Sequence, residues 1–379
     1  MKALFIPALI LVLLVSTLKA EEALFPIQKL EFIGETIVPN DTVISNTPVG
    51  GISGMDYYPV DERWVFISDD RSDFAPARAY LGSLPIAKDS VGPLKISDIV
   101  FFKQPDGSYY PNRKSFAENG KGIVPDLESV RFDPRNATLW YTSEGDRSLG
   151  LNPFFRSSLI DGSYIQGWSL PNYYNVNSKE DHKGFQNNLA LEGSSFSPDG
   201  AFYFVAMEGP LMQDGASPTI DHGANSRILK YDRLGNIMGE YVYPVDALPA
   251  KPGVGKHGDN GISEILAIDS SHLLVLERSG IQDDLGDYHD YVRIYQVDLE
   301  GATNVKGREQ LVESKFKPVV KKLLLNLNNL PIEHLDNIEC MSFGSVLPDG
   351  RKTLVVASDN NFYHKEITQI LAFTIYFTE

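Results

Sequence analysis

The chain has 379 residues, of which 42% are hydrophobic and 22% are charged, so it can bury a large core. Its formal net charge of −16 argues against nucleic-acid binding, because contacts with phosphates require basic patches. An acidic chain suits the binding of cations, and it equally suits simple solubility.

The first twenty residues have the pattern of a signal peptide. Lys2 supplies the positive start, residues 3–15 are apolar, and Ala20 stands where cleavage would occur. The apolar run is short for a membrane span, although an uncleaved anchor is the alternative. We therefore expect a periplasmic or secreted protein with no membrane span after cleavage, in which residues 21–379 form one domain.

A hairpin pattern recurs five times along the rest of the chain. It is clearest at residues 188–211, where two apolar strands flank a turn that contains Pro198 and Gly200. The other copies begin at Gly51, Asp126, Gly261 and Asn337. Such internal repetition indicates a repeat architecture.

Each copy carries polar residues at equivalent positions. A serine or glutamate stands near the start of the first strand, at Ser53, Glu128, Glu192, Ser263 and Glu339. An acid ends the second strand, at Asp69, Glu144, Glu208, Glu277 and Asp359. The start of one antiparallel strand lies beside the end of its partner, so these side chains should gather at one edge of each sheet.

Weaker strands follow each hairpin. Third strands are predicted near Ala77, Phe154, Ser226, Val292 and Thr368, and fourth strands near Ile96, Ser163 and Asn236. Four antiparallel strands repeated radially predict an all-β fold, a β-propeller of five blades, with six as the alternative. The last unit lacks a fourth strand, and the segment from Lys29 can supply it and so close the ring.

One segment departs from the strand pattern. A helical stretch is predicted from Arg308 to Leu330, because the apolar spacing from Val319 to Leu327 fits a helix on the rim of the propeller, where the outer strand of the fourth blade would otherwise stand.

The acids at the hairpin ends share a face with the longest loops, which include residues 171–188, 209–225 and 250–260. Histidines stand in these loops, at His182, His222 and His257. Arginines stand near the starts of third strands, at Arg78, Arg227 and Arg293, and shortly after hairpin acids, at Arg71, Arg147 and Arg278. We therefore predict a polar mouth at one end of the central channel.

Two interpretations of the acids stay open. In the first, they bind a cation in the channel, with ligands from Glu128, Glu192, Glu339, Glu208 and Asp359. Oxygen ligands without a cluster of Cys or His favour Ca²⁺. In the second, each acid pairs with an arginine of the adjacent strand, or accepts hydrogen bonds from backbone N–H groups, and only holds the blades together.

A cation beside arginines would suit a small anionic or ester substrate. Arg78, Arg227 and Arg293 are the predicted substrate-binding residues, because guanidinium groups match phosphate oxygens. A bound calcium ion can activate water for attack on phosphorus or on an ester carbonyl, with Glu192 or His257 as general base. The chain contains no G-x-S-x-G, H-E-x-x-H, P-loop or G-x-G-x-x-G motif.

Several motifs resemble the phytase-like family described as "esterase-like activity of phytase". They are GISGMDY at Gly51, DLESV at Asp126, LEGSSFSPDG at Leu191, EGPL at Glu208, GISEI at Gly261, DNIECM at Asp336 and SDNNF at Ser358. Two positions depart from the family pattern: Cys340 replaces a glycine, and Asn360 replaces an acid that could have served a metal. The resemblance implies a secreted or periplasmic propeller related to the calcium-dependent propeller phytases.

These observations favour a monomeric, metal-dependent hydrolase of phosphate or carboxylic esters. The alternatives are a propeller that only binds a ligand or a partner protein at the same mouth, and a lactonase-like propeller.

Overall fold

The computed structural model describes residues 25–176, 182–312 and 315–378. The predicted signal peptide lies outside the described residues. Within them, no helix is long and apolar enough to cross a membrane.

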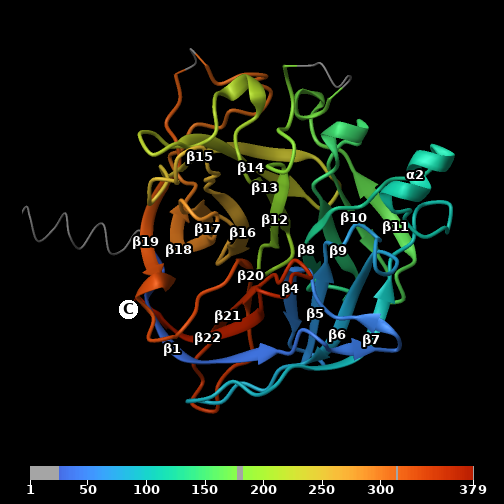
Figure 1. Cartoon of the computed structure of the whole chain (residues 1–379). Coiled ribbons are helices and arrows are strands. Elements are labelled where there is room, and N and C mark those ends of the chain that lie inside the picture. The colour runs from blue at the N-terminus through green and yellow to red at the C-terminus, as the bar shows by residue number, and fades with distance from the viewer. Residues whose placement is uncertain (1–24, 177–181, 313–314, 379) are drawn as a thin grey trace, which may run out of the picture.

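The strands form five four-stranded antiparallel sheets that are arranged as blades in a ring (Figure 1). From the channel outwards, blade one contains β4(Ile52–Tyr58), β5(Arg63–Ser68), β6(Arg78–Ser83) and β7(Lys95–Phe101). Blade two contains β8(Leu127–Phe132), β9(Leu139–Ser143), β10(Phe154–Ser158) and β11(Tyr164–Trp168). Blade three contains β12(Leu191–Phe196), β13(Phe202–Met207), β14(Ala224–Asp232) and β15(Ile237–Val245). Blade four contains β16(Gly261–Ala267), β17(His272–Gln282), β18(Tyr288–Asp298) and β19(Val320–Asn326).

Blade five joins the two ends of the described chain. It contains β20(Ile338–Phe343), β21(Thr353–Ser358) and β22(Thr368–Phe377), and its outer strand is β1(Ile27–Val38). The pairing of β1 with β22 runs from Ile27 opposite Phe377 to Val38 opposite Thr368. The predicted closure is therefore confirmed, and so is the five-bladed ring. A two-stranded hairpin, β2(Val43–Ile44) with β3(Thr47–Pro48), links β1 to blade one.

The predicted helix at residues 319–327 is wrong. These residues form β19, which pairs with β18 from Asp298 opposite Val320 to Arg293 opposite Asn326. Leu324 and Leu325 pack against the core between blades four and five. The free edge of β18 offers a row of backbone hydrogen bonds, and this pairing overrides the local helical spacing.

The core lies between neighbouring blades. Val65 and Ile67 of blade one, for example, pack against Val130, Leu139 and Tyr141 of blade two, and all five side chains are buried. Burying an aliphatic side chain of this size contributes about 1.5–3 kcal/mol. The second strands of the blades have a neighbouring blade on each side, which explains nearly continuous apolar runs such as that of β13.

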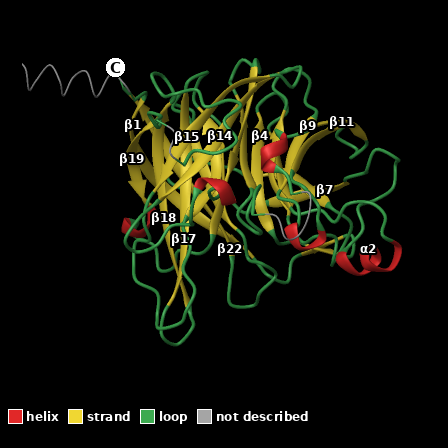
Figure 2. Cartoon of the chain, turned by 90° about the horizontal axis from the view of Figure 1, so that it is seen from above, coloured by secondary structure: helices red, strands yellow, loops and turns green. Residues whose placement is uncertain are grey.

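The longer connections lie on one side of the ring. Figure 2 shows α2(Arg113–Asn119) and several long loops on the side opposite to the C-terminus. The other helices are single 3₁₀ turns, namely η1(Arg147–Leu149), η2(Asn172–Tyr174), η3(Met212–Asp214) and η4(Leu327–Asn329).

One buried arginine connects all five blades at the centre of the ring. Arg131 of β8 forms an ion pair with Glu264 of β16, with 2.6 Å between Nη2 and Oε2. The same guanidinium group donates to backbone carbonyls of the four other blades, at 2.6 Å to Ser194, 2.6 Å to Met55, 3.0 Å to Met341 and 3.1 Å to Ile265. Arg131 thus closes the channel with a fully bonded charged group.

Candidate functional site

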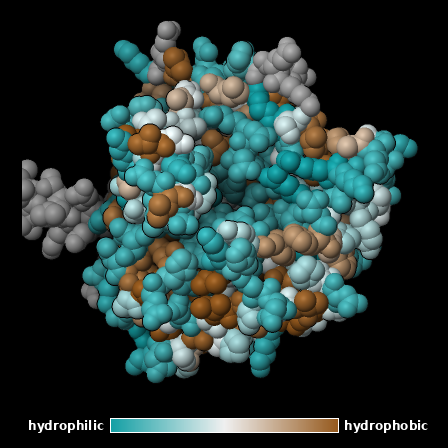
Figure 3. All heavy atoms as spheres, in the orientation of Figure 1, coloured by the Kyte–Doolittle hydropathy of each residue, from teal (hydrophilic) through white to brown (hydrophobic). Residues whose placement is uncertain are grey.

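The central channel opens on the face of the long loops into a cavity of about 590 Å³, which we call the acidic cavity. Figure 3 shows this hollow at the centre of the face, among hydrophilic residues. Twelve carboxyl groups line the cavity, whereas only two guanidinium groups do, those of Arg71 and Arg278. The residues therefore supply far more negative than positive charge, and the cavity attracts cations.

A bulge in every inner strand lies at the edge of this cavity. The register shifts between Ile52 and Gly54, Leu127 and Val130, Leu191 and Ser194, Ile262 and Glu264, and Ile338 and Cys340. The bulged segments contain the serine or glutamate of each repeat. Because a bulge re-aims a side chain, Glu128, Glu192 and Glu339 line the acidic cavity instead of staying between the blades.

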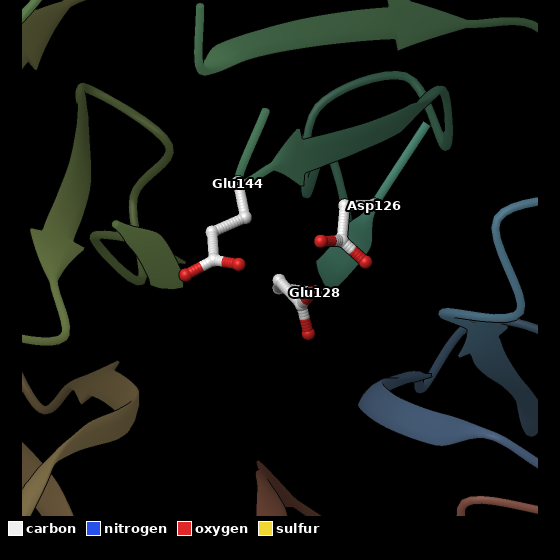
Figure 4. Close-up of side chains that lie close together, drawn as sticks. All are labelled: Asp126, Glu128 and Glu144. Atoms are coloured by element: carbon white, nitrogen blue, oxygen red, sulfur yellow. The ribbon is translucent and has the colours of Figure 1, made fainter. Parts of the chain in front are cut away.

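Five of the carboxylates form two overlapping groups that could hold a metal ion. Asp126, Glu128 and Glu144 form one group, and Glu144, Glu192 and Glu208 form the other. Within each group, one oxygen of every residue lies within 4.8 Å of the others. Figure 4 shows how the side chains of the first group converge. Glu144 belongs to both.

These carboxylates are only partly satisfied by the protein. Asp126 is held by Arg71, with 2.6 Å between Nε and Oδ1 and a second ion pair through Nη2. Glu144 accepts one hydrogen bond, from the backbone nitrogen of Ala190 at 2.7 Å. Among the described residues, no donor or cation bonds the carboxylates of Glu128 and Glu192. An all-oxygen donor set with free carboxylates fits a hard cation such as Ca²⁺.

The electrostatics agree with this fit. Burial, and then the charges of neighbouring acids, raise the pKa values of Glu128, Glu144 and Glu192 well above their usual range. Burial also raises the pKa of Glu208 to about 8, although Arg278 opposes the shift. Without a cation, these groups bind protons instead, because several like charges in one buried space cannot all ionise.

The pH dependence of stability should therefore reverse the usual trend for carboxylates. A raised pKa means that the folded protein binds protons more tightly than the unfolded chain does. In the presence of a chelator, the Tm should accordingly fall as the pH rises from the ordinary glutamate value of 4.5 to the value of about 8 for Glu208. Saturating Ca²⁺ should flatten this fall. Melting curves measured across that range test the expectation, and identical profiles with and without Ca²⁺ would contradict it.

A family model for phytase-like proteins, "Esterase-like activity of phytase", matches residues 47–362. The chain belongs to the phytase-like family. Among curated proteins, none has significant sequence similarity to this phytase-like chain.

Several solved structures match this phytase-like protein at low similarity. The catalytic domain of an α-L-arabinofuranosidase from Coprinopsis cinerea is 9% identical, with a TM-score of 0.42 over 92% of this chain and 97% of that chain. A gluconolactonase from Xanthomonas campestris is 11% identical, with a TM-score of 0.32 over 92% and 96% of the two chains. The Dos1 propeller is 9% identical, with a TM-score of 0.31 over 91% and 95%. Scores this low carry no argument about activity.

Most of the acids that we predicted as metal ligands lie in the acidic cavity. Glu128, Glu192, Glu208 and Glu339 line it. Asp359 does not: its side chain is buried, Oδ1 accepts from the backbone nitrogen of Asn361 at 3.0 Å, and Oδ2 has no hydrogen-bond partner among the described residues.

Glu277, the equivalent acid of blade four, also lies outside the acidic cavity. It accepts from the hydroxyl of Tyr243 and pairs with Lys321, each at 2.6 Å. For Glu277, the structure therefore matches the alternative that we left open, an acid paired within the fold.

The three arginines that we predicted to bind substrate do not line the acidic cavity, and this corrects the prediction. Arg78 is fully buried, pairs with Asp70 and donates to the hydroxyl of Tyr80 at 2.8 Å. Arg227 is fully buried between Asp214 and Glu240, at 2.6 and 2.5 Å. Arg293, on β18, is absent from the lining as well. Third strands are two strands away from the inner strands, which explains why their first residues stay between blades or in the rim.

Other residues were missed or underrated as parts of the site. Asp126 stands directly before the inner strand of blade two, and its place in the DLESV motif was the available signal. Asp259 had no such signal. It lies 3.0 Å from Nε2 of His257, which lines the cavity as predicted, whereas His182 and His222 are exposed and do not line it.

Proposed function

We propose that this phytase-like propeller is a metal-dependent hydrolase of phosphate or carboxylic esters that works outside the cytoplasm. The proposal rests on two clusters of three acidic residues that share Glu144. They lie in a cavity whose described lining has twelve carboxyl groups and two arginines. The signal-peptide pattern of residues 1–20 supports the location.

The acidic residues of the cavity would bind the metal. Either group would hold a divalent cation, Asp126 and Glu128 with Glu144, or Glu192 and Glu208 with Glu144, and Ca²⁺ fits the oxygen donors best. When bound, such an ion supplies Lewis acidity toward an ester oxygen and toward water.

A separate group is available to move a proton. Asp259 Oδ2 lies 3.0 Å from His257 Nε2 and fixes the ring, so that Nδ1 can accept a proton from water and return it to the leaving group. The imidazole stands at the open edge of the cavity, with its side chain 56% exposed.

The cavity arginines replace the ones that we expected from the sequence. Arg71 and Arg278 line the acidic cavity, and each already pairs with a carboxylate, Arg71 with Asp126 and Arg278 with Glu339 at 3.2 Å. They can turn unused N–H groups toward substrate oxygens while these pairs hold them in place.

Hydrolysis of p-nitrophenyl phosphate and p-nitrophenyl acetate tests the proposal. We expect turnover of at least one ester that disappears with a chelator and returns with added Ca²⁺. Glu192→Gln should lower kcat/KM by about 10- to 100-fold, because it removes one charged ligand. The matched control is Glu300→Gln, an exposed glutamate after β18, which should retain the native rate.

Turnover that survives the chelator, or a Glu192→Gln protein with native metal content and native activity, would refute the site. Calcium binding without hydrolysis of either ester would instead favour the propeller that only binds a ligand.

A further inference from the structure

Two phenylalanines form an aromatic wall on one side of the acidic cavity. Phe74 follows β5 and Phe362 follows β21, so the wall joins the loops of blades one and five. Both rings line the cavity, and their centroids lie 4.5 Å apart. The side chain of Phe74 is 60% exposed, which leaves one ring face open, whereas Phe362 is half-buried. The rest of the lining is mostly carboxylates, with a third aromatic ring, Tyr288, contributed by blade four.

The backbone that carries the wall is strained. Asn361 and Phe362 have φ angles of 46° and 50°, and Arg71 and Ser72 in the other loop have φ angles of 52° and 61°. Bulky residues rarely adopt this left-handed conformation, which is unfavourable and persists only where the surroundings impose it. Four of the nine described non-glycine residues with positive φ line the cavity, namely Arg71, Asn188, Asn361 and Phe362.

The surroundings of Phe362 are shaped to receive its ring. A Cβ atom at Gly51 would lie 2.6 Å from Phe362 Cε2, and one at Gly50 would lie 3.0 Å from Cε1. Asn360 Oδ1 accepts hydrogen bonds from the backbone nitrogens of both Gly51 and Phe362, at 3.1 and 3.2 Å. The Arg78 guanidinium carbon lies 5.9 Å from the ring centroid. Two glycines, an asparagine and an arginine thus fix the ring at the cavity edge.

The wall adjoins the carboxylates that would bind the metal. Arg71, three residues before Phe74, pairs with Asp126 of the first carboxylate group. The phenylalanines and these carboxylates line the same cavity, so an ester whose acidic part is held at the carboxylates can place its alcohol part against the phenylalanines. The cavity already holds many negative charges, so a flat uncharged group suits this position better than another anion.

We propose that Phe74, supported by Phe362, stacks on the leaving group of the substrate, and that the preferred substrates are esters of aromatic alcohols. This inference rests on the proposed function. In the reaction, water would break the bond between the aryl oxygen and the phosphorus or acyl carbon, and the products would be the free acid and the phenol. Stacking of two aromatic rings contributes about 0.5–1.5 kcal/mol beyond the buried area, enough to distinguish aryl from alkyl esters.

Binding of two non-hydrolysable probes tests the wall without turnover. In the presence of Ca²⁺, the native protein should bind phenylphosphonate more tightly than methylphosphonate in isothermal titration calorimetry. Phe74→Ala should weaken the binding of phenylphosphonate by about three- to tenfold and leave that of methylphosphonate unchanged. Phe74→Tyr keeps a ring and should restore the preference. Tyr109→Ala, which removes an exposed ring outside the cavity, is the control.

Equal affinity of the native protein for the two probes would overturn the inference, as would no detectable binding of phenylphosphonate. A Phe74→Ala change that weakens both probes equally would overturn it too, because it would indicate a general disturbance of the cavity. Failure of the proposed function has a different signature: no turnover of either p-nitrophenyl ester, with the aryl preference in binding intact.

Discussion

Replacing Arg131 by methionine should lower the free energy of unfolding by about 3–5 kcal/mol, the usual cost of removing one partner from a buried ion pair. Glu264 would lose its counter-charge in the centre of the ring, and four backbone carbonyls would lose their donor. Burial already raises the pKa of Glu264 to about 7 although Arg131 opposes the shift, so this carboxyl group is poorly stabilised as an anion without the arginine. Chemical denaturation at neutral pH measures the loss.

Two variants make this test specific. Arg135→Met removes an exposed arginine that donates to the backbone of Asp199 at 2.9 Å, and it should change the free energy of unfolding by less than about 0.5 kcal/mol. Combining Arg131→Met with Glu264→Gln should recover part of the stability, because Glu264 is then uncharged and only Asp56, whose Oδ1 lies 3.8 Å from Arg131 Nη1, loses a counter-charge. If Arg131→Met is no more destabilising than Arg135→Met, the connection of the five blades through Arg131 does not stabilise the ring.

Glu144→Gln should be the most damaging single substitution in the acidic cavity. Glu144 belongs to both carboxylate groups, so its neutralisation weakens both at once, whereas Glu192→Gln affects only the second. We expect a loss of calcium affinity of about 100-fold, at the upper end for a change at a metal site, with a parallel loss of any ester hydrolysis. The glutamine oxygen can still accept the hydrogen bond from the backbone nitrogen of Ala190, so the loop before β12 should keep its position.

The melting temperature of the Glu144→Gln protein provides an independent test of metal binding by Glu144. In a chelator at a pH of about 8, Glu144→Gln should melt at a higher temperature than the native protein, because a neutral glutamine removes the cost of either protonating or ionising a buried carboxyl group beside other acids. In excess Ca²⁺ the order should reverse, since the variant gains less from the ion. Glu300→Gln should follow the native protein under both conditions. A Glu144→Gln protein that is less stable with and without Ca²⁺ would assign Glu144 a purely structural role.

Features that depend on neighbouring residues in the chain could be predicted from the sequence, whereas features that depend on pairing between distant segments could not. The hairpin repeats could be predicted because apolar alternation and turns such as the one at Pro198 act within a few residues. The blade count and the closing strand at Lys29 followed from them. The strand at residues 320–326 could not, because its pairing partner β18 decides its conformation and a run of leucines suits either state.

The site was predictable in kind more than in detail. Repeated acids indicated the mouth, but which of them reach the cavity depends on the bulges beside Glu128 and Glu192, and bulges left no recognisable mark in the sequence. The pairing of Arg71 with Asp126 joins two blades across 55 positions in the chain. Only the folded ring decides that Arg71 and Arg278 face the cavity while Arg78 and Arg227 are buried in ion pairs within their own blades.

The pairing of β1 with β22 also places the two ends of the described chain side by side, which determines where a fusion partner or a surface can be attached. Ile27 and Phe377 meet at the end of the ring that lies away from the acidic cavity, where Phe377 lines a second, largely apolar depression. A tag, a tether or a partner domain joined next to Ile27 or Phe377 would therefore extend away from the face with the acidic cavity and leave its entrance unobstructed. Immobilisation through the ends should present every molecule to solution in the same productive orientation.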